Sequence, residues 1–198
     1  MGNTIALTDP FTLSLFFVFA AEMGDKTQLV ALAFATRYAT QTVLLGVFGA
    51  TLLVHLFSVG LGEIVGLTIP VFWVRVLAGV AFIAFGLWTL RGDELSDDDR
   101  FTEPRWGPLL TVGTTFFLAE LGDKTMLMTI TLASQHQSFV GVWLGSTLGM
   151  VVADGLAIMV GRVVGAQLPE RLIKLGAAAI FLVTGALTLF EALSNRLA

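Results

Sequence analysis

Residues 21–27 read Ala-Glu-Met-Gly-Asp-Lys-Thr and residues 119–125 read Ala-Glu-Leu-Gly-Asp-Lys-Thr, so one acidic motif occurs twice in the chain. Beyond the motif the correspondence continues at a constant spacing of 99 residues, as in the pairs Gly46 and Gly145, Gly62 and Gly161, and Pro70 and Pro169. The chain is therefore built from two related halves, and each half carries one copy of the motif.

The composition excludes a soluble globular protein. Of the 198 residues, 56% are hydrophobic and 13% are charged, whereas about a quarter of a soluble domain is charged. A transmembrane helix needs about 20 apolar residues, and six such stretches fit between helix-breaking residues. We predict an all-α membrane protein with six transmembrane helices, at residues 11–36, 42–66, 71–90, 107–133, 139–165 and 171–193.

The two halves are predicted to be inverted with respect to each other. Each half has three spans, and an odd number makes the second half enter the membrane from the opposite side. The predicted domains are a first three-helix repeat at 1–91, an acidic loop at 92–106 and a second, inverted repeat at 107–198. In transporters, inverted repeats place a binding site at their interface, near the middle of the bilayer.

The distribution of positive charge predicts the orientation. The loops after the first, third and fifth spans carry seven Lys and Arg residues, and the opposite side carries two. The positive-inside rule then places the central loop in the cytoplasm and both termini outside a cell (inner) membrane. We interpret the acidic central loop as a solvated linker, with a weak metal-attracting surface as the alternative.

Several classes of chemistry are excluded by composition. The chain has no cysteine, which removes disulfides, thiolate metal sites and cysteine nucleophiles. Its net charge of −4 and its lack of a basic cluster argue against nucleic acid as a partner. No phosphate-binding glycine loop is present to support ATP-driven pumping.

The motifs supply the candidate ligands. Glu22 and Asp25 are three residues apart and share a helical face, as do Glu120 and Asp123. Ionisable groups deep in a span are costly and are by default functional. If the inverted halves face each other, these four carboxylates converge on one site.

The remaining motif residues suggest which ions fit. Gly24 and Gly122 permit local unwinding or close approach, either of which would expose backbone carbonyls, and Thr27 and Thr125 add hydroxyl oxygens. A site of oxygen ligands without sulfur favours hard cations such as Ca²⁺, Mg²⁺ or Mn²⁺. The motif-supporting residues are Gly24, Lys26, Thr27, Gln28, Gly122, Lys124 and Thr125.

Charge counting suggests a mechanism. Four carboxylates and two lysines give a formal charge of −2, which one divalent cation would neutralise. Without the metal, desolvation and mutual repulsion favour protonated carboxyl groups. Metal ions and protons then compete for one site, which is the thermodynamic basis of an antiporter. The metal is a transported substrate, and no prosthetic group is expected.

Three further polar residues are candidates for a role at the site. Asp154, in the middle of the fifth span, corresponds to His55 in the second, and both are candidates for a proton relay. Gln28 could reach the same site as Asp25, whereas Met126 occupies the corresponding position in the second half. The two motifs are therefore not chemically equivalent.

The doubled motif resembles that of a known family. Glu-x-Gly-Asp-Lys-Thr occurring twice, in a chain of two three-span halves, is similar to the Gdt-type cation/proton exchangers, which include bacterial manganese exporters and Golgi manganese/calcium exchangers. The resemblance covers essentially the whole chain. It implies export of Mn²⁺ or Ca²⁺ in exchange for protons, with Glu22, Asp25, Glu120 and Asp123 as the metal-binding and proton-exchanging carboxylates.

Other interpretations of the same residues stay open at this point. The motifs could be buried ion pairs that only fix helix packing, or the Gly-Asp pairs could belong to an intramembrane aspartyl protease. The chain could also export a small organic solute, or form a passive cation channel. Small residues spaced by four in the second and fifth spans predict close helix packing within the chain, with a homodimer seam as the alternative.

Overall fold

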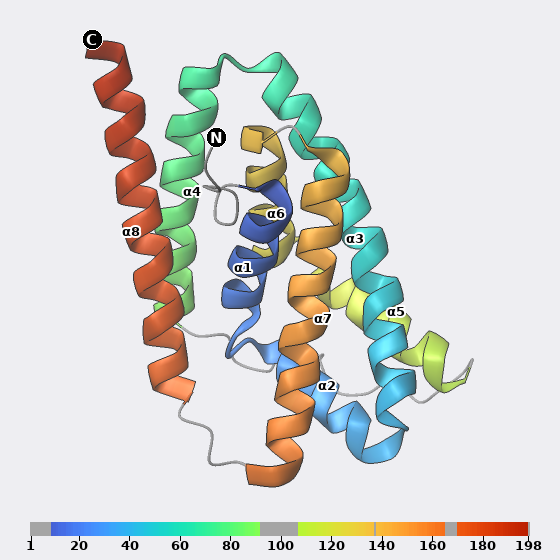
Figure 1. Cartoon of the computed structure of the whole chain (residues 1–198). Coiled ribbons are helices and arrows are strands. Elements are labelled where there is room, and N and C mark those ends of the chain that lie inside the picture. Colours follow the sequence, from blue (N-terminus) through green and yellow to red (C-terminus); the bar gives the residue numbers. More distant parts are fainter. Residues whose placement is uncertain (1–8, 92–106, 137, 165–169, 198) are drawn as a thin grey trace, which may run out of the picture.

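The computed structural model describes residues 9–91, 107–136, 138–164 and 170–197, and within these ranges all regular structure is helical (Figure 1). The predicted acidic loop at 92–106 lies outside the described residues. The helices are α1 (Pro10–Glu22), α2 (Lys26–Arg37), α3 (Thr40–Thr68), α4 (Val71–Arg91), α5 (Pro108–Glu120), α6 (Lys124–His136), α7 (Phe139–Val164) and α8 (Glu170–Leu197).

Two of the six predicted spans are not continuous helices. The prediction for 11–36 is corrected to α1 and α2, and that for 107–133 to α5 and α6, because the chain turns at Gly24 and Gly122. Among the described residues, four helical segments are long and apolar enough to cross a bilayer: Thr40–Thr68, Val71–Arg91, Phe139–Val160 and Leu175–Ser194. In its described residues the fold is therefore an all-helical membrane fold that combines full-length helices with broken ones.

The residues at which α1 and α5 begin are determined by the local sequence. The Asp9 carboxylate accepts a hydrogen bond from the backbone nitrogen of Thr12 at 3.2 Å, and Pro10 opens α1 at a position that needs no N–H. α5 begins in the same way with Pro108, directly after Gly107. Short polar or glycine-containing segments thus start the helices that lead to each motif.

Each broken helix packs against long ones. α1 packs on α7, and α3 packs on α5, α6 and α7. α4 and α8 pack along each other at one side of the bundle (Figure 1), and α4 also packs on α6. Among the described residues, α8 makes no comparable packing contact with α2.

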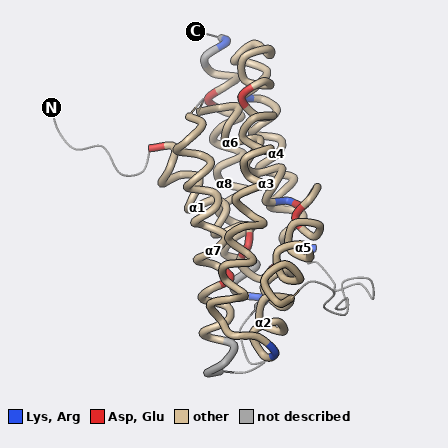
Figure 2. Tube along the Cα trace, turned by 90° about the vertical axis from the view of Figure 1, so that its right-hand side faces the viewer, with Lys and Arg blue, Asp and Glu red and all other residues tan. Residues whose placement is uncertain are grey.

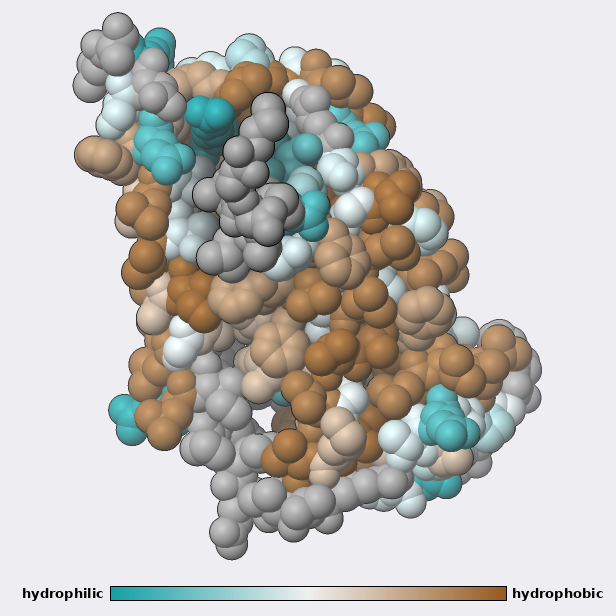
Figure 3. Space-filling view, viewed as in Figure 1, coloured by the Kyte–Doolittle hydropathy of each residue, from teal (hydrophilic) through white to brown (hydrophobic). Residues whose placement is uncertain are grey.

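The outer surface fits a lipid environment. Large apolar side chains are exposed along the long helices, including Phe57 on α3, Leu87 on α4 and Phe190 on α8. On the face shown in Figure 3, hydrophobic residues cover the middle of the molecule and hydrophilic ones gather towards its ends. The tube view in Figure 2 shows charged residues both near the ends of the bundle and along its middle.

Glycines allow the helices to approach closely within one chain, as the small-residue pattern predicted. A Cβ built on Gly66 of α3 would lie 2.5 Å from the carbonyl oxygen of Ser134 on α6. A Cβ on Gly149 of α7 would lie 2.5 Å from the carbonyl oxygen of Leu15 on α1. These small-residue faces are therefore occupied by helices of the same chain.

Gly62→Ala is expected to destabilise the protein by about 1–3 kcal/mol, the usual cost of overpacking. Its Cβ would lie 2.5 Å from the Ile130 carbonyl oxygen and 2.6 Å from the Ala133 Cβ, both on α6. Gly60→Ala on the same helix meets nothing within 4 Å, and removing a glycine there should stabilise α3 by about 0.5–1 kcal/mol. Thermal unfolding in detergent measures both; equal melting temperatures would contradict this packing.

Candidate cation site between the broken helices

The break between α1 and α2 is a type II β-turn. Met23 has φ −61° and ψ 117°, Gly24 has φ 77°, and the Asp25 nitrogen donates to the Glu22 carbonyl oxygen at 3.0 Å. A type II turn needs a positive φ at its third residue, which glycine adopts without strain. The turn ends α1 at Glu22 and makes Asp25 the residue that precedes α2.

The break between α5 and α6 has the same conformation. Leu121 has φ −65° and ψ 111°, Gly122 has φ 82°, and the Asp123 nitrogen donates to the Glu120 carbonyl oxygen at 3.2 Å. A Cβ on Gly122 would meet nothing within 4 Å. Of the two roles that the sequence left open for this glycine, the structure shows a backbone turn and not a close approach.

Gly122→Ala should therefore cost roughly 1–2 kcal/mol of stability, because alanine is strained at a positive φ. The cost comes from the backbone alone, since the added methyl group has free space. Gly49→Ala, in helical α3 with nothing within 4 Å of its Cβ, is the matched control and should not destabilise. Chemical denaturation in detergent separates the two; a Gly122→Ala variant as stable as the control would argue against the turn.

Each turn carries a glutamate that is bonded across the break. Thr27 on α2 donates its hydroxyl to Oε1 of Glu22 on α1, and Thr125 on α6 donates to Oε2 of Glu120 on α5 at 2.6 Å. Both glutamates are buried, at 0% and 1% exposure. Their other carboxylate oxygens have no hydrogen-bond partner among the described residues. Each motif thus presents one carboxylate oxygen that is bonded and one that is open to a further ligand.

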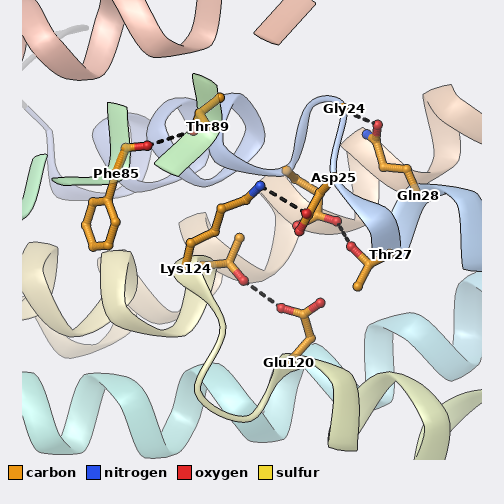
Figure 4. Close-up of polar contacts among 10 residues, drawn as sticks. Gly24, Asp25, Thr27, Gln28, Phe85, Thr89, Glu120 and Lys124 are labelled. Carbon is orange, nitrogen blue, oxygen red and sulfur yellow. Dashed lines mark hydrogen bonds and ion pairs between the residues drawn. The ribbon is translucent and has the colours of Figure 1, made fainter. Parts of the chain in front are cut away.

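An ion pair joins the two motifs. The Lys124 ammonium, at the start of α6, lies 3.0 Å from Oδ1 of Asp25, at the start of α2 (Figure 4). Asp123, the counterpart of Asp25, is also buried. The side chain of Lys26, the counterpart of Lys124, lies outside what the structure describes. The lysine of the second half therefore neutralises the aspartate of the first.

Asp154 belongs to the same electrostatic group. It is fully buried on α7, and neither carboxylate oxygen has a hydrogen-bond partner in the described part of the chain. Asp154 interacts electrostatically with Asp25, and Glu22 interacts with Glu120, Asp154 and Asp25. These carboxylates therefore influence one another's charge, and we call Glu22, Asp25, Glu120, Asp123 and Asp154 the acidic cluster.

His55 and Gln28 each contact α7. His55 is buried on α3, and its Nδ1 lies 3.3 Å from the Thr147 hydroxyl on α7. The Gln28 side-chain oxygen accepts from the Gly24 nitrogen at 2.9 Å, and its Nε2 donates to the Ala153 carbonyl oxygen at 3.3 Å. Gln28 thus ties the first turn to α7, beside Asp154.

In the second turn a thioether takes the place of this amide. The Gly122 nitrogen lies 3.2 Å from the Met126 sulfur, which is a weak acceptor. The difference between Gln28 and Met126, visible in the sequence, therefore gives the first turn a link to α7 that the second turn lacks.

In this arrangement the cluster is not a completed ligand cage. Within the described ranges, no three His, Asp or Glu side chains are grouped closely enough to hold a metal ion. The oxygen chemistry nevertheless fits a hard cation, because the cluster supplies carboxylates and the Thr27 and Thr125 hydroxyls bond two of them. A cation bound here would need the carboxylates to close around it.

Comparison with known proteins identifies the family. The model of the family described as divalent cation/proton antiporter GDT1 matches two segments of the chain, residues 10–97 and 108–196. A protein of Vibrio cholerae named "Putative manganese exporter" is 32% identical over 90% of this chain and 89% of its own length. A GDT1-like protein of Synechocystis is 29% identical over 86% of this chain and 92% of its own length.

No solved structure matches the chain significantly. The family consists of transporters and not of enzymes. Two matched segments, each carrying one broken helix and one copy of the motif, account for most of the sequence. The chain therefore belongs to the GDT1 family of divalent cation/proton antiporters.

Proposed function

We propose that this protein exports a divalent cation, Mn²⁺ first and Ca²⁺ second, from the cytoplasm in exchange for protons. Glu22, Asp25, Glu120 and Asp123 bind the cation and the protons in turn. The observation that carries the proposal is the acidic cluster: four motif carboxylates, contributed by two broken helices, are buried together with Asp154. The manganese in the name of the Vibrio cholerae relative supports the choice of metal.

The proposed architecture is six transmembrane spans in two inverted three-helix repeats, 1–91 and 107–198. It is supported by the two separate matches of the family model. Helix contacts also occur in corresponding pairs: α1 packs on α7 as α5 packs on α3, and α2 packs on α7 as α6 packs on α3. In this architecture α1 and α5 are half-spans that end near the middle of the membrane.

The proposed exchange of metal ions for protons follows from their competition for the carboxylates of the acidic cluster. Burying several negative charges together is unfavourable, so the carboxylates are occupied either by protons or by a metal ion. Thr27 and Thr125 hold one oxygen of each glutamate and leave the other for the ligand. Asp154, and His55 at the corresponding position of the other half, are proposed to relay protons to and from the cluster.

The proposed location is the inner membrane of the cell, with both termini outside and the central loop in the cytoplasm. The support is the excess of Lys and Arg in the loops after the first, third and fifth spans. The bilayer is then the chain's immediate environment, and a second copy of the chain is an alternative partner for the exposed helix faces.

Reconstitution tests the proposal. Purified protein in liposomes should take up Mn²⁺ saturably, with simultaneous movement of protons out of the vesicle, reported by an internal pH dye. Collapsing an imposed proton gradient should slow the uptake. Mn²⁺ flux that ignores pH would indicate a channel instead, and folded protein that moves neither Mn²⁺ nor Ca²⁺ would indicate an organic-solute exporter.

A further inference from the structure

Lys124 is held in an unusual place for a lysine. Its side chain is 4% exposed, and its ammonium group lies 3.0 Å from a carboxylate whose side chain is 0% exposed. It is the first residue of α6, where the positive end of the helix dipole disfavours a cation. Neither solvation nor its own helix therefore explains why Lys124 is here.

Asp25 also departs from its local preference. It is the N-cap residue of α2, the position at which an aspartate usually bonds the free N–H groups of the first turn. In this structure Asp25 makes no such side-chain bond, and its carboxylate meets Lys124 instead. Both residues thus give up local stabilisation for a pair that crosses from one half of the chain to the other (Figure 4).

The pair occupies the position where a transported cation would bind. Asp25 interacts electrostatically with Glu22, Glu120 and Asp154, so the ammonium of Lys124 lies within the field of the whole acidic cluster. A divalent cation on Asp25 would be repelled by an ammonium group at hydrogen-bonding distance from the same carboxylate. Binding of a divalent cation to Asp25 and pairing of Lys124 with Asp25 therefore weaken each other.

We propose that Lys124 is a tethered counter-ion that neutralises Asp25 when no metal is bound and is displaced from it when a divalent cation binds. This inference rests on the proposed function and adds a residue that sets metal affinity by competition. Because Lys124 begins α6 and Asp25 precedes α2, the exchange of one cation for the other also removes an ion pair that links the two broken helices.

Two variants of Lys124 should change metal affinity in opposite directions. Lys124→Gln removes the competing charge, so Mn²⁺ should bind about tenfold more tightly. Lys124→Arg keeps the charge and can pair with a carboxylate through two parallel hydrogen bonds, so Mn²⁺ should bind several-fold more weakly. A lysine that only stabilises the fold would give weaker binding and a lower melting temperature in both variants.

The experiment is a calorimetric titration of the purified, detergent-solubilised full chain with MnCl₂, which gives the Mn²⁺ affinity. A melting curve is recorded for each variant. Arg91→Gln removes one positive charge from the exposed end of α4 and should leave affinity unchanged. Weaker or equal Mn²⁺ binding by Lys124→Gln would overturn the inference. If that variant does not fold, Lys124→Arg decides alone: weaker Mn²⁺ binding at an unchanged melting temperature is expected. Unchanged affinity, or weaker binding together with a lower melting temperature, overturns the inference. Failure of the unaltered chain to bind Mn²⁺ or Ca²⁺ would instead contradict the proposed function.

Discussion

Glu120→Gln should reduce Mn²⁺-driven proton movement by about 100-fold while the protein stays folded, because loss of a residue that only orients a metal ligand already costs about 10–100-fold. Glutamine has nearly the same size, and its side-chain oxygen can still accept the Thr125 hydroxyl that now bonds Glu120. The substitution removes the negative charge and replaces Oε1 of Glu120, the carboxylate oxygen that has no hydrogen-bond partner among the described residues, with an amide nitrogen. Glu22→Gln should behave in the same way, because Thr27 holds Glu22 similarly.

The measurement is Mn²⁺ uptake and internal pH in liposomes, with a melting curve to establish folding. Glu191→Gln, at an exposed position of α8, is the matched control and should transport normally. The glutamate variants test the site more directly than Asp25→Asn does. Neutralising Asp25 would leave the buried Lys124 without the carboxylate that lies 3.0 Å away, which would also destabilise the fold. Near-normal exchange by both glutamine variants would remove these residues from the site.

Asp154→Asn should uncouple protons from metal. Asp154 lies outside the motifs on α7, fully buried and in electrostatic contact with Asp25, so it can hold a proton close to the metal ligands without being one of them. We expect Mn²⁺ to bind with affinity close to that of the unaltered protein. Proton-driven uptake should fall by about 100-fold, in the range lost when a positioned proton-transfer group is removed.

The control for Asp154→Asn is Ser146→Ala, which removes another buried polar group of α7 that has no hydrogen-bond partner in the described ranges. Uptake by this variant should be unchanged. Parallel measurement of Mn²⁺ binding and of the pH dependence of uptake separates the two roles of Asp154. Loss of Mn²⁺ binding would make Asp154 a ligand, and unaltered proton-driven uptake would make it a structural residue.

The positions of the helices were largely predictable because lipid-spanning helices are recorded in the sequence as long apolar runs. The predicted span at 71–90 coincides with α4 to within one residue at each end. The breaks in two other spans were harder to predict, because apolar residues flank both turns and only Gly24 and Gly122 mark them. A glycine in an apolar run can serve either a turn or a close contact, and the sequence alone leaves both open.

Pairings between side chains were less predictable than their clustering. The repeated motifs indicated which carboxylates are buried, but not that Lys124 meets Asp25 of the other half. The pair joins two residues that are 99 positions apart and belong to different copies of the motif, and neither copy by itself indicates it. The bond from Gln28 to the Ala153 carbonyl has no signal in the sequence either, because it joins a motif side chain to the backbone of a distant helix.

The unequal contacts of α4 and α8 make the two membrane faces different. In the proposed orientation α6 lies in the outer half of its span and α2 in the inner half, so the packing of α4 on α6 holds together the outer half alone. α4 and α8 lie along each other, and the packing of α4 on α6 has no comparable counterpart between α8 and α2 among the described residues. In the proposed orientation, different helix contacts therefore separate the acidic cluster from the two sides of the membrane.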